Sequence, residues 1–266
     1  MQEAKWSKIL QTYFKEYAFK KSDISTGSGR ISFNPESTAL LAEYNPPVIS
    51  FHFGLPADSL LAQIKNLGAY VLASATNLEE AKWLEANGTD AIIAQGLEAG
   101  GHRGIFLNND LSTQVTTFEL LKQIVGITKL PVIAAGGIST ANDVAKALSL
   151  GASAVQIGTA YLLCTETKTS QILRAAIKSK KTRKTVITNI FSGRPARGIE
   201  NRSIREIGPI NADTPEFPLA AAISALRTKA EAVGVDDFTP LWCGENISGC
   251  SEIPAAELTR LLVTEL

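Results

Sequence analysis

The chain of 266 residues contains two histidines, His52 and His102, and each follows a short apolar run. His102 lies behind an acid and two glycines in QGLEAGGHRG, and His52 lies in SFHFG. An imidazole gains or loses its proton near neutral pH, so it suits proton abstraction or the stabilisation of an anion. Both stand at the ends of expected strands, so we expect both to point toward one mouth of the fold. We favour a catalytic role over a purely structural one, for His102 more than for His52.

Glycine-rich bends follow two later apolar runs. One bend, AAGGIST, contains Gly136 and Gly137, and the other, QIGTAYLLCTE, contains Gly158 and Thr159. Glycines let the backbone approach a ligand closely, and the helix expected after the first bend offers N–H groups at its start. Two successive loops of this kind are typical of the phosphate site of a barrel. We therefore expect a substrate or cofactor that carries a phosphate, with plain turns as the alternative.

Other residues narrow the kind of ligand. Gln95, at an expected strand end, and the glycine pair at 100–101 suit close contact with the edge of a flat ring. A metal has little support, because two histidines without a carboxylate pair at ligand spacing do not form a usual donor set. The three cysteines match neither a zinc pattern nor a disulfide framework, which indicates a reducing compartment.

A regular alternation of strands and helices must position these residues. Continuous apolarity is typical of strands that are buried on both faces. Helical patterns lie between the runs. Asn77 is expected to cap one helix in a capping-box arrangement with Glu80, and Thr140 or Ser139 is expected to cap the next, which Gly151 is expected to end. The alternation predicts a parallel sheet with helices outside, and the glycine-rich strand ends favour a TIM (β/α)₈-type barrel over a doubly wound sheet. The apolar runs are 47–53, 69–75, 90–96, 131–137 and 152–158.

About five βα units are recognisable where a complete barrel has about eight, so we expect an α/β fold with an incomplete barrel. Residues 1–46 predict an N-terminal helix and connector, and residues 47–190 predict the partial barrel with the active-site loops. Residues 191–266 predict a C-terminal helical layer packed on the barrel. Unpaired strand edges favour self-association, so a homo-oligomer is expected.

Composition excludes several classes of partner. Lys and Arg together number 26 and are balanced by 26 acids, which argues against a nucleic-acid partner and against an anionic membrane surface. The apolar stretches are shorter than the ~20 residues of a membrane span, and the N-terminus lacks the apolar core of a signal peptide. We expect a cytoplasmic protein that acts on a small molecule.

Five motifs carry a resemblance to a known family. SFHFGLP, QGLEAGGHRG, PVIAAGGIST, AVQIGTAYLLCTE and FSGRPARG, in this order and spacing, resemble the nitronate monooxygenase family from about residue 47 to the C-terminus. The resemblance implies an FMN-dependent TIM barrel that needs no metal. Such an enzyme oxidises alkyl nitronates, for example propionate 3-nitronate, with O₂ to a carbonyl product plus nitrite or nitrate.

The resemblance also implies roles for individual residues. His102 would be the catalytic histidine, and His52 would line the substrate side. Gln95 and Gly100 would contact the flavin, and Gly137 would contact its phosphate region. The phosphate itself would be bound by Gln156, Ile157, Gly158 and Thr159.

The chain departs from the family pattern at its beginning, where about three βα units of the barrel have no counterpart. We therefore expect weak or absent FMN binding by the isolated chain. Two alternatives stay open: an FMN-dependent enoyl-acyl carrier protein reductase, which shares a similar glycine-rich histidine loop, and an inactive remnant or interaction module. Arg194 and Arg197 of FSGRPARG meet either an anion or a structural ion-pair partner.

Overall fold

The computed structural model describes residues 2–24, 31–179, 184–216 and 221–266. Its contacts divide the chain into two compact units, each built from three segments. The β/α unit consists of Ile31–Ala99, Arg103–Thr167 and Asn246–Leu266, and the second unit of Met1–Arg30, Gly100–His102 and Lys168–Glu245.

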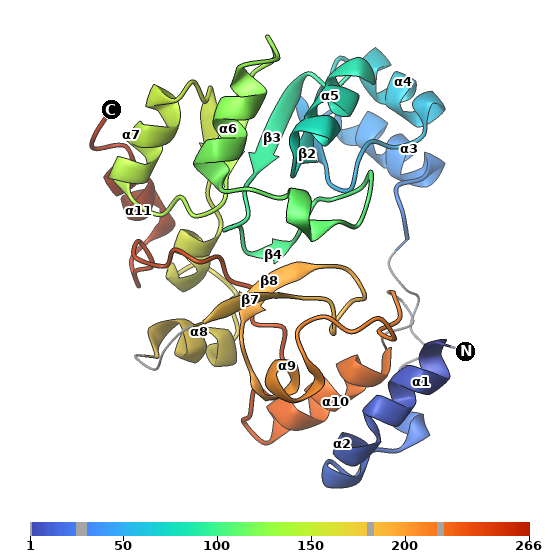
Figure 1. Ribbon diagram of the computed structural model, residues 1–266. Coiled ribbons are helices and arrows are strands. Elements are labelled where there is room, and N and C mark those ends of the chain that lie inside the picture. The colour runs from blue at the N-terminus through green and yellow to red at the C-terminus, as the bar shows by residue number, and fades with distance from the viewer. Residues whose placement is uncertain (1, 25–30, 180–183, 217–220) are drawn as a thin grey trace. The chain divides into compact units, whose positions relative to one another are not determined.

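A five-stranded parallel sheet forms the centre of the β/α unit (Figure 1). The sequential order of its strands is also their spatial order, as expected for consecutive βα units. Each strand falls within one of the five apolar runs, which confirms the predicted fold class, an incomplete barrel of the (β/α)₈ type. The strands are β1 (Val48–Phe51), β2 (Tyr70–Ala75), β3 (Ala91–Gln95), β5 (Val132–Ala135) and β6 (Ala154–Gln156).

Helices cover one face of this sheet and bury its main hydrophobic core. Alternate residues of the strands, such as Ala73, Ile92 and Val132, share this core with Leu84 and Leu120 of the helices. Burial of each leucine contributes about 1.5–3 kcal/mol. The helices of this unit are α3 (Pro35–Tyr44), α4 (Asp58–Asn66), α5 (Leu78–Ala86), α6 (Thr117–Val125), α7 (Ala141–Ser149) and α11 (Ala255–Leu262), with the 3₁₀ turns η2 (Leu111–Thr113) and η3 (Thr159–Leu163).

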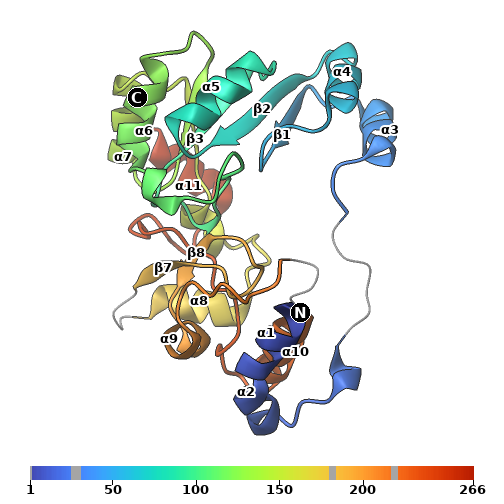
Figure 2. The same ribbon diagram turned by 45° about the vertical axis from the view of Figure 1, so that its right-hand side comes forward.

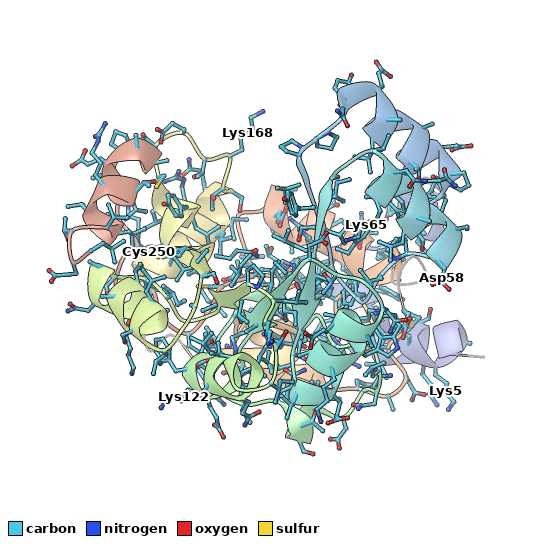
Figure 3. The ribbon with its side chains drawn as sticks, turned by 90° about the horizontal axis from the view of Figure 1, so that it is seen from above. Lys5, Asp58, Lys65, Lys122, Lys168 and Cys250 are labelled. Atoms are coloured by element: carbon cyan, nitrogen blue, oxygen red, sulfur yellow. The ribbon has the colours of Figure 1, made fainter. Side chains whose placement is uncertain are left out.

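The outer surfaces of these helices are charged. Asp58 of α4 and Lys122 of α6 are exposed and lie at the rim of the unit when it is seen from above (Figure 3). Polar outer faces and apolar inner faces are the pattern expected of helices that pack on a sheet. A candidate site is therefore to be sought among the residues on the face of the sheet opposite to the helices.

The second unit is built on a three-stranded antiparallel sheet in the order β4-β8-β7. Trp6, Leu10 and Tyr13 of the N-terminal helices share its core with Ile223 and Leu226, and α1 lies beside α10 (Figure 2). The elements are β4 (Gly101–His102), β7 (Thr185–Thr188) and β8 (Ala196–Ile199), with α1 (Gln2–Ile9), α2 (Gln11–Glu16), η1 (Lys21–Asp23), α8 (Gln171–Lys178), α9 (Arg202–Ile207) and α10 (Ala221–Ala232).

Each compact unit combines segments that are distant in the sequence. The N-terminal helices group with residues 168–245, because their apolar side chains are buried there. The last segment, residues 246–266, groups with the β/α unit, because Leu258 and Leu262 of α11 are buried in its core. In the described parts of the chain, no helix has both the length and the apolarity to cross a bilayer.

Candidate functional site

The carboxyl ends of three neighbouring strands carry a polar row on the face opposite to the helices. Gln95 is aligned with Ala135, and Ala135 is aligned with Gln156. Aligned residues of parallel strands project to the same face, while their neighbours project to the other. Ala94 and Ala134 belong to the core beneath the helices, so Gln95 and Gln156 project away from it. Two strand spacings, about 10 Å, separate the two glutamines.

His52 stands at the same end of the sheet. Because Phe51 is aligned with Ala73, the next residue on each strand, His52 and Ser74, also come together. The Nδ1 atom of His52 lies 3.1 Å from the Oγ atom of Ser74. Sequence reasoning missed Ser74, although a serine in an otherwise apolar strand was the signal that could have found it.

Gly104 packs directly against the His52 ring. A β-carbon at this position would lie 2.9 Å from Cε1 of His52 and 3.1 Å from the β-carbon of Ser74. The ring also contacts Phe53, with a centroid separation of 4.5 Å. Phe53 has a φ of +68°, a left-handed conformation that a residue with a bulky side chain rarely adopts. The imidazole thus contacts both a glycine and an aromatic residue in a rare backbone conformation.

Gln95 and Arg103 connect this histidine to the loop QGLEAGGHRG. The Oε1 atom of Gln95 accepts a hydrogen bond of 2.7 Å from the Gly104 N–H. The buried guanidinium of Arg103 donates to the main-chain oxygens of Gln95 and Ala99, and its Nε donates to Gln114 at 2.8 Å. Arg103 and Ala99, which flank the segment 100–102, are therefore linked by a hydrogen bond, and Arg103 is also linked to Gln95 at the end of β3.

The buried carboxylate of Glu80 binds the main chain just after the same loop. Glu80 was expected to close a capping box at Asn77, and Asn77 does cap α5 by accepting from the Glu80 N–H. The Glu80 side chain, however, accepts from Thr76 N–H and hydroxyl, and from Phe106 N–H at 2.7 Å. This carboxylate fixes the loop to the end of β2, a link between residues too distant in the sequence to be predicted.

The bend after β5 is closed by a helix cap and by the C-terminal segment. Gly136 and Gly137 have φ values of +116° and +66°. Thr140, one of the two expected caps, forms a capping box with Asp143 at the start of α7, and Asp143 also accepts from the Ser139 N–H. These main-chain N–H groups already have side-chain partners, so the start of α7 offers a ligand fewer donors than the sequence predicted. Asn246 donates to Gly137 O at 2.9 Å.

The bend after β6 leaves more room. Apart from its chain neighbours, no described atom lies within 4 Å of a β-carbon built at Gly158. Gln156 and Gly158 are exposed, while Ile157 packs against the hydrophobic core. Cys250 donates from its thiol to Thr159 O at 3.2 Å, so the C-terminal segment reaches this bend too (Figure 3).

His102 and Gly100 belong to the second unit. His102 pairs with Ala196 between β4 and β8, and its Nε2 lies 2.8 Å from the Ser192 hydroxyl oxygen. The Trp242 ring contacts the imidazole at 5.4 Å between centroids. A β-carbon at Gly100 would lie 2.4 Å from Gly244 N, so only glycine fits there.

Ion pairs bind both arginines of FSGRPARG. The buried Arg197 pairs with Glu245 at 2.8 Å, and its guanidinium also donates to the Thr185 hydroxyl. Arg194 pairs with Glu216 at 3.7 Å. Of the two alternatives, these contacts favour a structural role for the arginines over binding of an external anion.

The structure thus distributes the predicted residues between the units. The β/α unit brings His52, Gln95, Gly137 and the segment Gln156–Thr159 to the carboxyl ends of its strands, and the second unit holds Gly100 and His102. Within the described residues, no three side chains of His, Cys, Asp or Glu gather as a metal site requires.

Comparisons with known proteins agree with one another. A family model described as nitronate monooxygenase matches residues 1–265. The nitronate monooxygenases of Paraburkholderia phytofirmans and Pseudomonas aeruginosa are 40% and 39% identical to this chain over 99% of its length. The matched regions cover 73% and 76% of those relatives, so the chain spans about three quarters of their length.

Two solved structures are also similar. One is a nitroalkane oxidase from Streptomyces ansochromogenes, with 33% identity and a TM-score of 0.86 over 100% of this chain and 76% of that one. The other is FabK from Thermotoga maritima, with 28% identity and a TM-score of 0.70 over 89% of this chain and 74% of that one.

Proposed function

The chain belongs to the nitronate monooxygenase family, and on this premise we propose that it oxidises alkyl nitronates with O₂, using FMN as its cofactor. The resemblance seen in the five sequence motifs is confirmed. The observation that carries the proposal is the match of the family model along residues 1–265. The expected products are a carbonyl compound and nitrite or nitrate.

The residues at the carboxyl ends of the strands fit FMN. Its phosphate needs backbone donors in an open bend, and Gly158 has room where a side chain would otherwise stand. Gly137 adds a backbone conformation, φ +66°, that a side chain would strain. We assign the phosphate to Gly137 and the segment Gln156–Thr159, and the ring edge to Gln95 and Gly100. When bound, FMN supplies the electron-accepting chemistry that nitronate oxidation by O₂ requires.

The remaining tasks belong to the side chains of this protein. A nitronate is an anion that already lacks the acidic proton, so the protein has to bind and orient it and to keep water away. We assign His102 as the catalytic histidine, a base or an electrostatic partner for the anionic nitronate, and His52 to the substrate side. Hydrogen bonds to Ser192 and Ser74, respectively, orient the two rings.

Composition and sheet topology support the setting we propose. We place the protein in the cytoplasm, and we expect small molecules but no nucleic acid as partners, since the formal net charge is zero. Self-association is expected through β1 and β6, the two outer strands of the sheet.

Oxygen consumption and FMN binding test the proposal together. The purified chain is titrated with FMN, and O₂ uptake is then recorded with propionate 3-nitronate. Uptake that depends on both FMN and the nitronate is the expected result. Oxidation of NADH with an enoyl thioester would indicate the reductase instead, and a chain inert in both assays would indicate an interaction module. The expectation of weak FMN binding stays a prediction, and the same titration measures it.

A further inference from the structure

Ser192 is placed to decide which nitrogen of His102 carries a proton. We propose that Ser192 is a positioning residue that holds neutral His102 in the Nε2–H form, so that Nδ1 is the nitrogen that accepts a proton or a hydrogen bond. The catalytic consequence rests on the proposed function, while the proton assignment rests on the second unit alone. Ser192 opens the motif SGRPARG, whose role the sequence left open.

The assignment follows from counting the protons of one hydroxyl. A serine hydroxyl has one proton to donate and two lone pairs that accept. Arg194 O lies 3.2 Å from the Ser192 hydroxyl oxygen and can only accept a hydrogen bond, whereas His102 Nε2, at 2.8 Å, can accept or donate. In the proposed arrangement, the single hydroxyl proton points to Arg194 O and the hydroxyl oxygen accepts from His102. The donor in that bond is therefore Nε2–H. A neutral imidazole has one N–H, which leaves Nδ1 unprotonated.

The turn that carries Ser192 is held firmly in place. The N–H groups of Ser192 and Gly193 both donate to Asn189 O, at 3.2 and 2.7 Å. Gly193 has a φ of +77°, and a β-carbon there would lie 2.4 Å from the Glu216 Cα, so the turn packs closely on its neighbour. The preceding Phe191 is buried in the core of the unit. A hydroxyl on such a turn has a fixed position.

The His102 ring is held equally well. Its backbone pairs with Ala196 of β8, and the Trp242 ring meets the imidazole at an interplanar angle of 60°. Trp242 in turn contacts Phe191 at 5.7 Å between centroids, so the ring and its serine share one aromatic support. Rotation of the ring by a half turn would remove Nε2 from the Ser192 hydroxyl.

The chain offers a matched control in its other histidine. His52 also meets a serine, but through Nδ1, at 3.1 Å from Ser74 Oγ. The two pairs lie in different compact units. A serine substitution in one pair should therefore leave the protonation form of the other histidine unchanged.

Nitrogen-detected NMR of the imidazoles tests the assignment without any assay of activity. The full chain is labelled with ¹⁵N, and its two histidines are distinguished with the variant His52→Gln. Wild-type His102 is expected in the Nε2–H form above its titration range. Ser192→Ala should give a mixture of the two forms, Ser192→Thr should retain the wild-type form because it keeps a hydroxyl, and Ser74→Ala should leave His102 as in the wild type.

Several outcomes would overturn the proposal. An Nδ1–H form in the wild type does so even if no variant folds, and so does a Ser192→Ala spectrum identical to that of the wild type. In the oxygen assay, Ser192→Ala should lower kcat/KM about tenfold and Ser192→Thr should restore most of it. A wild type that consumes no O₂ with nitronates contradicts the proposed function, while the spectra still decide the role of Ser192.

Discussion

The guanidinium of Arg103 connects three parts of the candidate site at the residue scale. It is fully buried and donates to Gln95 O, Ala99 O and the Gln114 side chain. Several buried donors on one rigid fork are a property of arginine that lysine lacks. Arg103, the residue after His102, thus does more than the glycines to fix the position of the loop QGLEAGGHRG.

Arg103→Lys is expected to destabilise the protein by about 2–4 kcal/mol, because an ammonium cannot reach all three acceptors and stays buried. Urea unfolding followed by tryptophan fluorescence measures the change. The matched substitution Arg194→Lys affects a partly exposed ion pair and should change stability by less than about 0.5 kcal/mol. Equal stability of the two variants would contradict the role assigned to Arg103.

Gly104→Ala tests the position of the other histidine. The added methyl group would lie 2.9 Å from His52 Cε1, so the ring must move away from Ser74. We expect kcat/KM for a nitronate to fall about tenfold or more, since a misplaced binding group is costly to catalysis. Gly126→Ala, at the end of α6 where φ is −69°, is the control and should be nearly neutral. Unchanged activity of Gly104→Ala would remove His52 from the site.

Residue types alone identified the candidates but not their partners. His52, His102 and Gln95 stood out because polar side chains ended apolar runs. Ser74 and Ser192 did not stand out, because the contacts of a serine depend on the register of a sheet or on the position of a distant turn. Ser192, for example, is 90 residues away from His102 in the sequence.

At the scale of elements, local signals predicted helix ends well and short antiparallel strands poorly. Thr140 caps α7, and Gly151, with a φ of +96°, follows its end as expected. β8 lies within residues 191–266, where no strand was expected, because its four residues are too few for an alternation to be recognised. Pairing partners, rather than local propensity, create such a strand.

Tyr13 and Tyr17 of the N-terminal segment donate hydrogen bonds to Glu206 and Asp237, and the contribution of this cluster to stability depends on pH. Burial, followed by a hydrogen bond to Asp237, raises the pKa of Tyr17 to about 12. Burial and Glu206 also raise the pKa of Tyr13. Arg202 and Tyr13 lower the pKa of Glu206. The protonated phenols of Tyr13 and Tyr17 and the ionised carboxylate of Glu206 are therefore the forms that the folded state favours.

Stability should decline in alkaline solution as pH rises from about 10, where an unfolded tyrosine ionises, to about 12. A raised pKa in the folded state contributes stability below the unfolded value and loses it above, which fixes the sign. Urea midpoints at about pH 8 and about pH 11 measure the decline, and Tyr17→Phe should make it smaller. Tyr44→Phe, an exposed tyrosine of α3, is the control. A decline as large in Tyr17→Phe as in the wild type would exclude Tyr17 as a cause.

At the scale of the whole molecule, the sequence predicted the β/α alternation but not the composition of the two units. Periodicity reports which residues are buried, and it placed five strands and their helices. It cannot report that Trp6 and Leu10 are buried with Ile223 and Leu226, since that contact joins residues more than two hundred positions apart. Position along the chain alone therefore gives no indication that the N-terminal helices group with residues 168–245, or that residues 246–266 group with the β/α unit.

The central claim is that this chain oxidises nitronates with FMN and that His102 takes part. Oxygen consumption with propionate 3-nitronate, measured for the FMN-treated wild type and for His102→Gln, tests it most directly. We predict nitronate-dependent uptake by the wild type and a loss of about a hundredfold or more in kcat/KM for the variant, the usual scale for removal of a catalytic side chain. Wild-type and variant proteins that consume O₂ at the same rate, or a wild type that consumes none, would contradict the claim.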